Sequence, residues 1–253
     1  MTEAVLAARG LTRYFGGLAA NKNVSIALAR GELHAVVGPN GAGKSTLINL
    51  LSGDLPASAG SIAYKGREIS RLSADRRSRL GVGRSYQKIN IFPGFTVFEN
   101  CRLAAQSRAP QPLRLFSDAR RNRAICDAAD HALARTGLRG RGGATAAALS
   151  HGEQRQLEIA MVLATDPDVL LLDEPLAGMG AEESAGMVDL LKKLSPNHAI
   201  MLVEHDMDAV LSVADVITVM VDGEVLETGA PGRIRASPAV QQAYLGNGED
   251  HDG

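Results

Sequence analysis

Short apolar runs bounded by glycine and polar residues occur at both ends of the chain, and their spacing predicts its elements. Before residue 40 the runs predict strands at Val5–Leu6, Val24–Leu28 and Leu33–Val37, and residues 61–64 predict another. After residue 168, runs of strand length alternate with segments of helical spacing. The predicted strands there are Val169–Leu172, Ile200–Val203 and Val216–Val221, and the predicted helices are Ala181–Leu194 and Met207–Val213. This alternation predicts a parallel sheet covered by helices.

The middle of the chain has a different pattern. Residues 88–148 are rich in alanine and arginine, and their apolar positions recur at helical spacing. We therefore expect a mostly helical insertion in a single domain of residues 1–253. The predicted core comprises residues 1–87 and 159–253, and the predicted helical subdomain comprises residues 88–158.

Composition narrows the class of protein. The chain has 253 residues, of which 45% are hydrophobic and 22% charged, as in ordinary globular proteins. The net charge of −1 gives no electrostatic argument for a nucleic-acid partner. No apolar run approaches the roughly 20 residues that span a bilayer, and the first residues lack the pattern of a signal peptide. These features predict a cytosolic location.

Residues 38–45, GPNGAGKS, match the phosphate-binding motif G-x-x-x-x-G-K-[ST] in full. The motif lies between the predicted strand Leu33–Val37 and an apolar helical segment, residues 46–51. Its glycines let backbone N–H groups converge on a polyphosphate at a helix N-terminus. Lys44 is predicted to reach the β- and γ-phosphates, and to point into the site when no nucleotide is bound; the Ser45 hydroxyl is predicted to hold Mg²⁺. The expected nucleotide contacts here are Asn40, Gly41, Gly43, Lys44, Ser45 and Thr46.

Two acids follow the strand Val169–Leu172 at the edge where α/β sheets bind ligands. Asp173 is predicted to hold Mg²⁺ through water, and Glu174 to polarise an attacking water as a general base. The alternative is an ordinary helix start before Pro175.

A capping box is predicted for Ser150 and Glu153, which precede an amphipathic run. One interpretation is simply a well-capped helix. The other is a helix N-terminus that presents the Ser150 hydroxyl and the Gly152 N–H to a phosphate.

These elements occur in an order that resembles the ATP-binding subunits of ABC transporters. The ordered features are Phe15, the phosphate loop, Gln87, Leu149–Glu153, Asp173–Glu174 and His205. Within these features, the amino-acid sequence resembles that of importers of branched-chain amino acids and of their close relatives for urea and amides. The segments that carry this narrower resemblance are residues 15–18, 38–45, 84–87, 175–179, 204–207 and 243–246.

The resemblance implies a fold and a set of roles. It implies an α/β fold of the RecA-like P-loop NTPase class, in which a mainly parallel sheet is accompanied by an N-terminal antiparallel portion and an inserted helical subdomain carrying the signature motif. Phe15 would stack on adenine, Gln87 would contact Mg²⁺ or the attacking water, and His205 would hydrogen-bond the γ-phosphate. Ser150 and Gly152 would close on the γ-phosphate bound to a second subunit.

The implied protein is the ATP-hydrolysing subunit of an importer, with ATP and Mg²⁺ as its ligands. Its implied partners are two membrane permeases, a second ATPase subunit, identical or different, and, indirectly, a periplasmic solute-binding protein. It would lie on the cytoplasmic face of a prokaryotic inner membrane. Rival classes are a soluble ABC ATPase that does not transport and a phosphate-loop kinase of small molecules.

Two motifs depart from the family pattern, at three positions. The signature usually reads Leu-Ser-Gly-Gly-Gln, whereas His151 and Glu153 replace the first glycine and the glutamine here. Gly180 stands where the loop after Glu174 usually has an aspartate, which puts the coupling between the two nucleotide sites in doubt.

Arginines gather in two stretches, which predict either a solvated face or a surface near acidic helices or anionic lipid. The first comprises Arg67, Arg71, Arg76, Arg77, Arg79 and Arg84, and the second Arg114, Arg120, Arg121 and Arg123.

Overall fold

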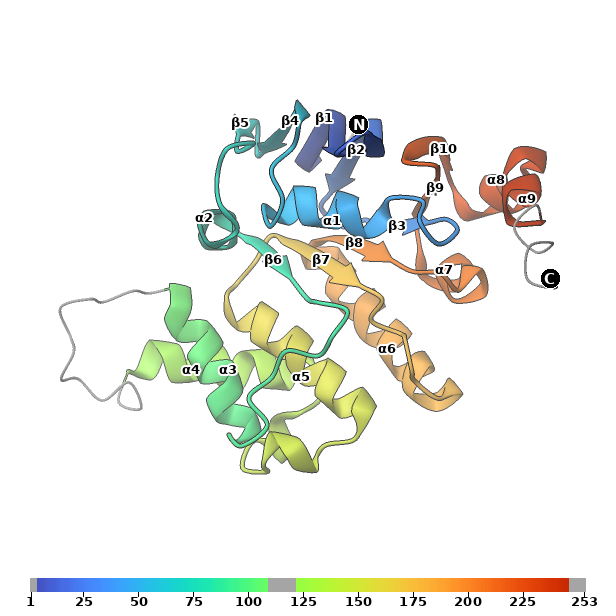
Figure 1. The fold of residues 1–253 in the computed structure, drawn as a ribbon. Helices are drawn as coiled ribbons and strands as arrows, with labels where there is room; N and C mark the ends of the chain where they lie inside the picture. The colour runs from blue at the N-terminus through green and yellow to red at the C-terminus, as the bar shows by residue number, and fades with distance from the viewer. Residues whose placement is uncertain (1–3, 109–121, 246–253) are drawn as a thin grey trace.

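The computed structural model describes residues 4–108 and 122–245, which contain two sheets (Figure 1). The smaller sheet has the order β2-β1-β4-β5 and is antiparallel, and the larger has the order β10-β9-β3-β8-β7-β6. The strands of the smaller sheet are β1 (Ala4–Phe15), β2 (Leu18–Ala29), β4 (Ala59–Tyr64) and β5 (Arg67–Glu68). Those of the larger are β3 (Leu33–Val37), β6 (Val82–Arg84), β7 (Val169–Asp173), β8 (Ala199–Val203), β9 (Val216–Val221) and β10 (Glu224–Gly229).

The helices divide into two groups. Helix α1 (Lys44–Ser52) lies between the two sheets, and α3 (Val97–Arg108), α4 (Arg123–Arg135) and α5 (His151–Ala164) gather on the other side of the larger sheet (Figure 1). The remaining helices are α2 (Ala74–Leu80), α6 (Ala181–Leu194), α7 (Met207–Val213), α8 (Pro231–Ala236) and α9 (Pro238–Leu245). This arrangement agrees with the expected α/β fold, in which an antiparallel N-terminal portion and an inserted helical subdomain accompany a mainly parallel sheet.

The central strands β3, β7 and β8 are buried along their whole length and pair in parallel. Their side chains still alternate between two cores. Leu170 and Leu172 pack in the core shared with the helical group, whereas Val169 and Leu171 pack in the core shared with α1 and the antiparallel sheet. Because successive side chains of a strand point to opposite faces, one apolar run serves both layers.

Several predicted bounds agree with the structure, among them those of β3, α6, α7 and β9. Strands β1 and β2 are longer than predicted, since each spans 12 residues and includes polar, exposed positions. The larger sheet is parallel except for β10, which pairs antiparallel with β9 at one edge. Helix α2 and strand β6 were not predicted.

The solvated-face interpretation of the first arginine cluster is wrong for Arg77, which is 1% exposed. Its Nη1 donates to the carbonyl oxygens of Leu50 and Leu51 at 2.7 and 2.9 Å. These carbonyls lie in the last turn of α1, where they lack helical partners, so the guanidinium caps that helix. Arg114, Arg120 and Arg121 lie outside the described residues, and the Arg123 side chain is 94% exposed.

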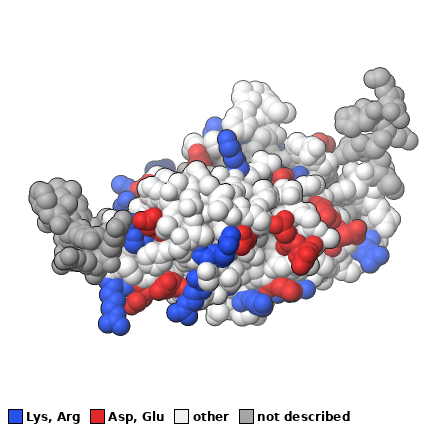
Figure 2. Space-filling view, turned by 90° about the horizontal axis from the view of Figure 1, so that it is seen from below, with Lys and Arg blue, Asp and Glu red and all other residues white. Residues whose placement is uncertain are grey.

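Basic and acidic side chains are interleaved on the face seen in Figure 2, in keeping with the net charge of −1. Within the ranges 4–108 and 122–245, no helix combines the length and apolar character needed to cross a bilayer.

Helix α5 runs without a break across the predicted domain boundary between residues 158 and 159, so that boundary does not coincide with the end of an element.

Candidate functional site

The phosphate loop connects β3 to α1 and is enclosed on two sides by other strands. Gly38 and Gly43 have φ angles of 152° and 92°, which favour glycine. A Cβ atom on Gly38 would lie 2.1 Å from the Met220 carbonyl oxygen, and one on Gly43 would lie 2.3 Å from that of Ala20. The loop therefore requires glycine at both positions, for conformation and for space.

Lys44 begins α1, and its side chain is mostly buried at 7% exposure. Lys44 lines the pocket over the loop, as expected, and its ammonium donates to the carbonyl oxygens of Gly38 and Pro39 at 2.6 and 2.9 Å. Burial lowers the pKa of Lys44, and the carboxylates of Glu174 and Asp173 oppose that shift. The cation is held by the loop itself, in position to exchange carbonyl partners for phosphate oxygens.

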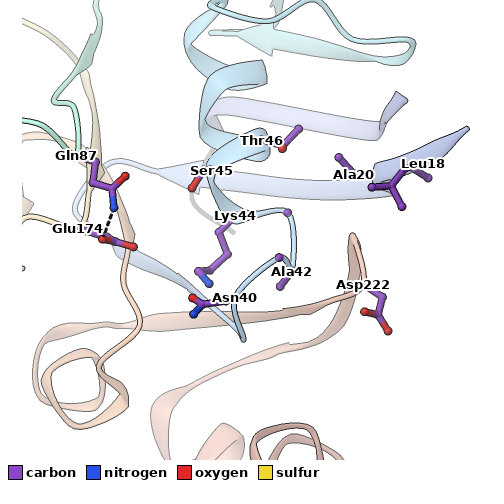
Figure 3. Close-up of a pocket in the computed structure, with 13 residues that line it drawn as sticks. Leu18, Ala20, Asn40, Ala42, Lys44, Ser45, Thr46, Gln87, Glu174 and Asp222 are labelled. Atoms are coloured by element: carbon purple, nitrogen blue, oxygen red, sulfur yellow. Dashed lines mark hydrogen bonds between the residues drawn. The ribbon is translucent and has the colours of Figure 1, made fainter. Parts of the chain in front are cut away.

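An open pocket of about 430 Å³ lies over this loop. Figure 3 shows Lys44, Ser45 and Asn40 on one side and Gln87 with Glu174 on another. Its lining residues are Leu18, Ala19, Ala20, Asn40, Gly41, Ala42, Gly43, Lys44, Ser45, Thr46, Gln87, Glu174 and Asp222. The structure thus brings the predicted phosphate-loop contacts together with Gln87 and Glu174, which are far away in sequence.

Asp173 is the last residue of β7 and is 5% exposed. Its Oδ2 lies 3.5 Å from Nη2 of Arg84, whose Nη1 makes a closer ion pair of 2.5 Å with Asp54. Burial raises the pKa of Asp173, and the positive charge of Arg84 opposes that shift. A buried carboxylate with so long an ion pair fits a site for a cation.

Glu174 follows directly and has a positive φ of 48°, which is unusual for this residue type. Its Oε2 accepts a hydrogen bond of 2.9 Å from Nε2 of Gln87 (Figure 3). The Nδ1 atom of His205, which lies after β8, is 3.9 Å from Oε1 of Glu174. The backbone turn thus directs this carboxylate toward Gln87 and His205, two other predicted site residues.

The loop that carries Gln87 is held by a buried ion pair on α5. Arg155 and Glu158 are 2% and 3% exposed, and their side chains lie 2.7 Å apart. Arg155 donates to the carbonyl oxygens of Tyr86 and Gln87, and Glu158 accepts from the Tyr86 N–H. The carboxylate and both terminal nitrogens of the guanidinium are bonded to each other or to the loop backbone, which fixes the position of Gln87.

Sequence reasoning missed a second buried acid, Glu204, which is 0% exposed. Its carboxylate accepts from the N–H of Leu176 at 2.9 Å and of His205 at 3.4 Å. It therefore joins the segment after β7 to the segment after β8. Its sequence signals were its position directly before His205 and its place in the segment 204–207, which carries the narrower resemblance.

Asn21 and Asp222 were also missed. The buried Asn21 side chain donates to the Gly43 carbonyl oxygen at 3.1 Å, and Asp222 lines the pocket. Asn21 lies within β2 and Asp222 in the turn after β9, so their proximity to the loop follows from the packing of two sheets. No local motif indicated either residue.

Four predicted nucleotide contacts, Phe15, Ser150, Gly152 and His205, do not line the pocket. Phe15 is 45% exposed at the end of β1, where the Arg13 guanidinium lies 4.8 Å from its ring centroid. The capping box of Ser150 and Glu153 is confirmed, but Ser150 and Gly152 lie at the start of α5, outside this pocket. His205 also lies outside the lining, with a side chain 59% exposed.

In the described part of the chain, no group of three or more His, Cys, Asp or Glu side chains could hold a metal ion by itself. A cation that takes one or two carboxylates or hydroxyls and completes its shell with substrate phosphates and water suits such a site, as Mg²⁺ does in nucleotide enzymes. Ser45 and Asp173 are the side chains that fit this mode.

A family model described as ABC transporter matches residues 21–177. The chain is 38% identical over 253 residues to the high-affinity branched-chain amino acid transport ATP-binding protein LivG of Salmonella typhimurium, covering 97% of this chain and 99% of LivG. It is 37% identical over 254 residues to the corresponding protein BraF of Pseudomonas aeruginosa, with the same coverage of both chains.

The fold matches solved cassettes over nearly their full length. A nucleotide-free ATP-binding cassette from an ABC transporter aligns with a TM-score of 0.86 at 26% identity, covering 96% of this chain and 99% of the cassette. The ADP conformation of an ATP-binding cassette aligns with a TM-score of 0.85, covering 97% of this chain and 100% of that one. With its complete phosphate loop and this full-length similarity, the chain belongs to the ABC transporter family as an ATP-binding subunit that hydrolyses ATP to drive transport.

Proposed function

We propose that this ATPase subunit drives the import of branched-chain amino acids. The observation that carries the proposal is the similarity to LivG and BraF along the whole chain, together with the phosphate loop and the acids after β7. Urea or amide import is the second candidate, because the motif sequences resemble those of urea and amide importers as well.

In the proposed site, backbone N–H groups of residues 38–46 and the N-terminus of α1 bind the phosphates of ATP. Lys44 is assigned to the β- and γ-phosphates, with Asn40, Gly41, Gly43 and Thr46 as further contacts. Phe15 is assigned to the adenine face, since its exposed ring lies in the same sheet as the pocket-lining residues of β2. Such stacking contributes about 1–3 kcal/mol.

Ser45, Asp173 and Gln87 are the proposed residues for Mg²⁺, which would neutralise charge that develops on the phosphates. Glu174 is the proposed general base, and its carboxylate is oriented by Gln87 and lies near His205. His205 is assigned to the γ-phosphate. A positioned base of this kind contributes roughly 10²–10⁴-fold to a rate.

The proposed site is completed by a second ATPase subunit, identical or different. Ser150 and Gly152 lie outside the pocket of their own chain, so they are assigned to the γ-phosphate held by that partner. Two permeases and, indirectly, a periplasmic solute-binding protein are the remaining proposed partners. The proposed location is the cytoplasmic face of a prokaryotic inner membrane.

Uptake by cells of the native host tests the proposal. We expect deletion of this gene to abolish ATP-dependent uptake of labelled leucine, isoleucine or valine, and to leave urea uptake unchanged. Wild-type protein should restore uptake, whereas Lys44→Ala, which removes the cation of the loop, should not. Loss of urea uptake with normal leucine uptake would favour the second candidate, and normal uptake of both would contradict importer function for these solutes.

A further inference from the structure

The two signature donors, the Ser150 hydroxyl and the Gly152 N–H, both bind the same carboxylate oxygen within the subunit. Oε1 of Glu183 accepts from Ser150 Oγ at 3.1 Å and from the Gly152 N–H at 3.2 Å. Glu183 lies in the first turn of α6, 31 residues from Gly152. The contact therefore joins the N-terminus of α5 to the N-terminus of α6.

Local geometry favours this contact. A Cβ atom at position 152 would lie 2.7 Å from Oε1 of Glu183, so only glycine lets the carboxylate approach the α5 backbone. The Ser150 oxygen already accepts from the Glu153 N–H at 3.2 Å, which leaves its hydroxyl hydrogen free to donate to Glu183. The positive end of the α5 dipole attracts the same negative charge.

The chemistry of the carboxylate matches that of a phosphate. Both present anionic oxygens that accept charge-assisted hydrogen bonds from hydroxyl and backbone N–H groups. One oxygen of Glu183 therefore uses the donors that the proposed function assigns to a γ-phosphate from the second subunit. The two anions cannot hold these donors at the same time.

We propose that Glu183 is a positioning residue that occupies the signature donors in the separate subunit and must be displaced before two subunits close on ATP. This inference rests on the proposed function of Ser150 and Gly152. In the separate subunit, Glu183 keeps the start of α5 ordered and linked to α6. Its displacement opposes closure, so it raises the ATP concentration at which subunits dimerise.

The same turn of α6 offers a matched control. Glu182 carries the same charge and is exposed, and like Glu183 it lies in the first turn of the helix. The N-cap residue of α6 is Gly180, which has no side chain to cap the helix. The negative charges near this N-terminus are therefore those of Glu182 and Glu183. Glu182→Gln therefore changes the charge at the helix dipole as Glu183→Gln does, while leaving the contact with the signature donors intact.

The experiment measures ATP-dependent dimerisation by sedimentation velocity. All proteins carry Glu174→Gln, which should retain ATP binding and slow hydrolysis enough to trap dimers. We expect Glu183→Gln and Glu183→Ala to dimerise at an ATP concentration lower by about fivefold or more, the effect of removing a hydrogen bond to a charged acceptor. Glu182→Gln should leave the midpoint unchanged. An unchanged or higher midpoint for both Glu183 variants, or an equal shift for Glu182→Gln, overturns the proposal.

Hydrogen exchange in the monomer separates this inference from the proposed function. Without ATP, the Gly152 amide should exchange faster in Glu183→Gln than in Glu182→Gln, because its acceptor is weakened. Unchanged exchange overturns the role of Glu183 whatever the dimers do. If the exchange changes as expected but no variant dimerises at saturating ATP, then the shared site between identical subunits is wrong, while the assignment of Glu183 to these donors stands.

Discussion

At the scale of single residues, Asp173 combines a proposed ligand role with an electrostatic cost. The carboxyl is almost fully buried at the end of β7, and burial raises its pKa in the folded protein above the ordinary value. A raised folded-state pKa means that the folded state binds the proton more tightly than the unfolded chain does. Its favourable contribution is therefore complete below the unfolded pKa of about 4 and is lost as the pH rises through the folded pKa.

We accordingly expect Asp173→Asn to raise the melting temperature at pH 7, well above the unfolded pKa, because burial disfavours the charged form of the wild-type carboxyl. The difference should shrink as the pH falls toward about 4, because the wild-type carboxyl then becomes protonated in both states. Thermal unfolding of both proteins between pH 4 and 8, without nucleotide, provides the measurement. A variant that is less stable at pH 7, or a difference that grows at low pH, would show that the Arg84 ion pair outweighs the cost of burial.

Among the residues of the site, the sequence motifs identified those whose partners are near in the chain. The phosphate loop and the capping box are local patterns, and their geometry was predictable from them. The hydrogen bond from Lys44 to its own loop was not predictable. The motif indicates which ligand Lys44 binds, but not which group it contacts when no ligand is bound. Glu183 and Glu204 were missed for another reason. Both partners of Glu183, and the Leu176 N–H bound by Glu204, lie 28–33 residues away and are brought close only by folding.

At the scale of elements, α5 has two sources of stability that differ in kind. Its N-terminus is closed by the capping box, a local feature. Its middle holds the buried pair of Arg155 and Glu158, which the backbone of residues 86–87 completes. Removing one partner of such a pair leaves the other charge buried and unpaired.

Arg155→Ala should therefore lower the free energy of unfolding by about 3–5 kcal/mol. Arg123→Ala is the control, because that side chain is 94% exposed and its loss should change stability by no more than about 0.5 kcal/mol. Urea denaturation followed by circular dichroism measures both. Equal stability of the two variants would mean that Glu158 is neutralised or hydrated once Arg155 is removed.

The elements also show which sequence signals were sufficient. Helices α6 and α7 and strands β3 and β9 have clear apolar periodicity, and their bounds were predicted correctly. Helix α2 has the sequence ADRRSRL, whose three arginines gave no indication in the sequence that one face is buried. The side chain that packs there is Arg77 itself, which is buried because its guanidinium meets free carbonyl oxygens at the end of α1. Arginine normally indicates a solvent-exposed position, but here it makes an interior contact.

At the scale of the whole molecule, the proposed machinery is divided between two places. Glu174, Gln87 and Lys44 border the pocket at one edge of the larger sheet, whereas Ser150 and Gly152 lie beyond it at the start of α5. One subunit therefore presents the two halves of a site at separate positions. Under the proposed function, a complete site combines the pocket of one subunit with the signature helix of another.

The isolated subunit should accordingly hydrolyse ATP slowly, and its rate per subunit should rise with protein concentration as dimers form. The rate divided by protein concentration, measured over a hundredfold dilution at saturating ATP, tests this expectation. Ser150→Ala should flatten the dependence by removing one donor from the shared site. A shared site would be contradicted if the rate per wild-type subunit stayed constant on dilution to concentrations at which no dimer is detected.

Helix α5 passes uninterrupted from Ser150 through Arg155 to Glu158, and this continuity has a mechanical consequence. Ser150 and Arg155 are about 8 Å apart along the helix axis at 1.5 Å per residue. The guanidinium grips the carbonyl oxygens of Tyr86 and Gln87, so a force applied to that loop reaches the helix directly. A helix resists stretching and bending over this length of about 1.4 turns, so its two ends are mechanically linked. A displacement of the Gln87 loop that keeps these hydrogen bonds would therefore shift the Ser150 end of α5 as well.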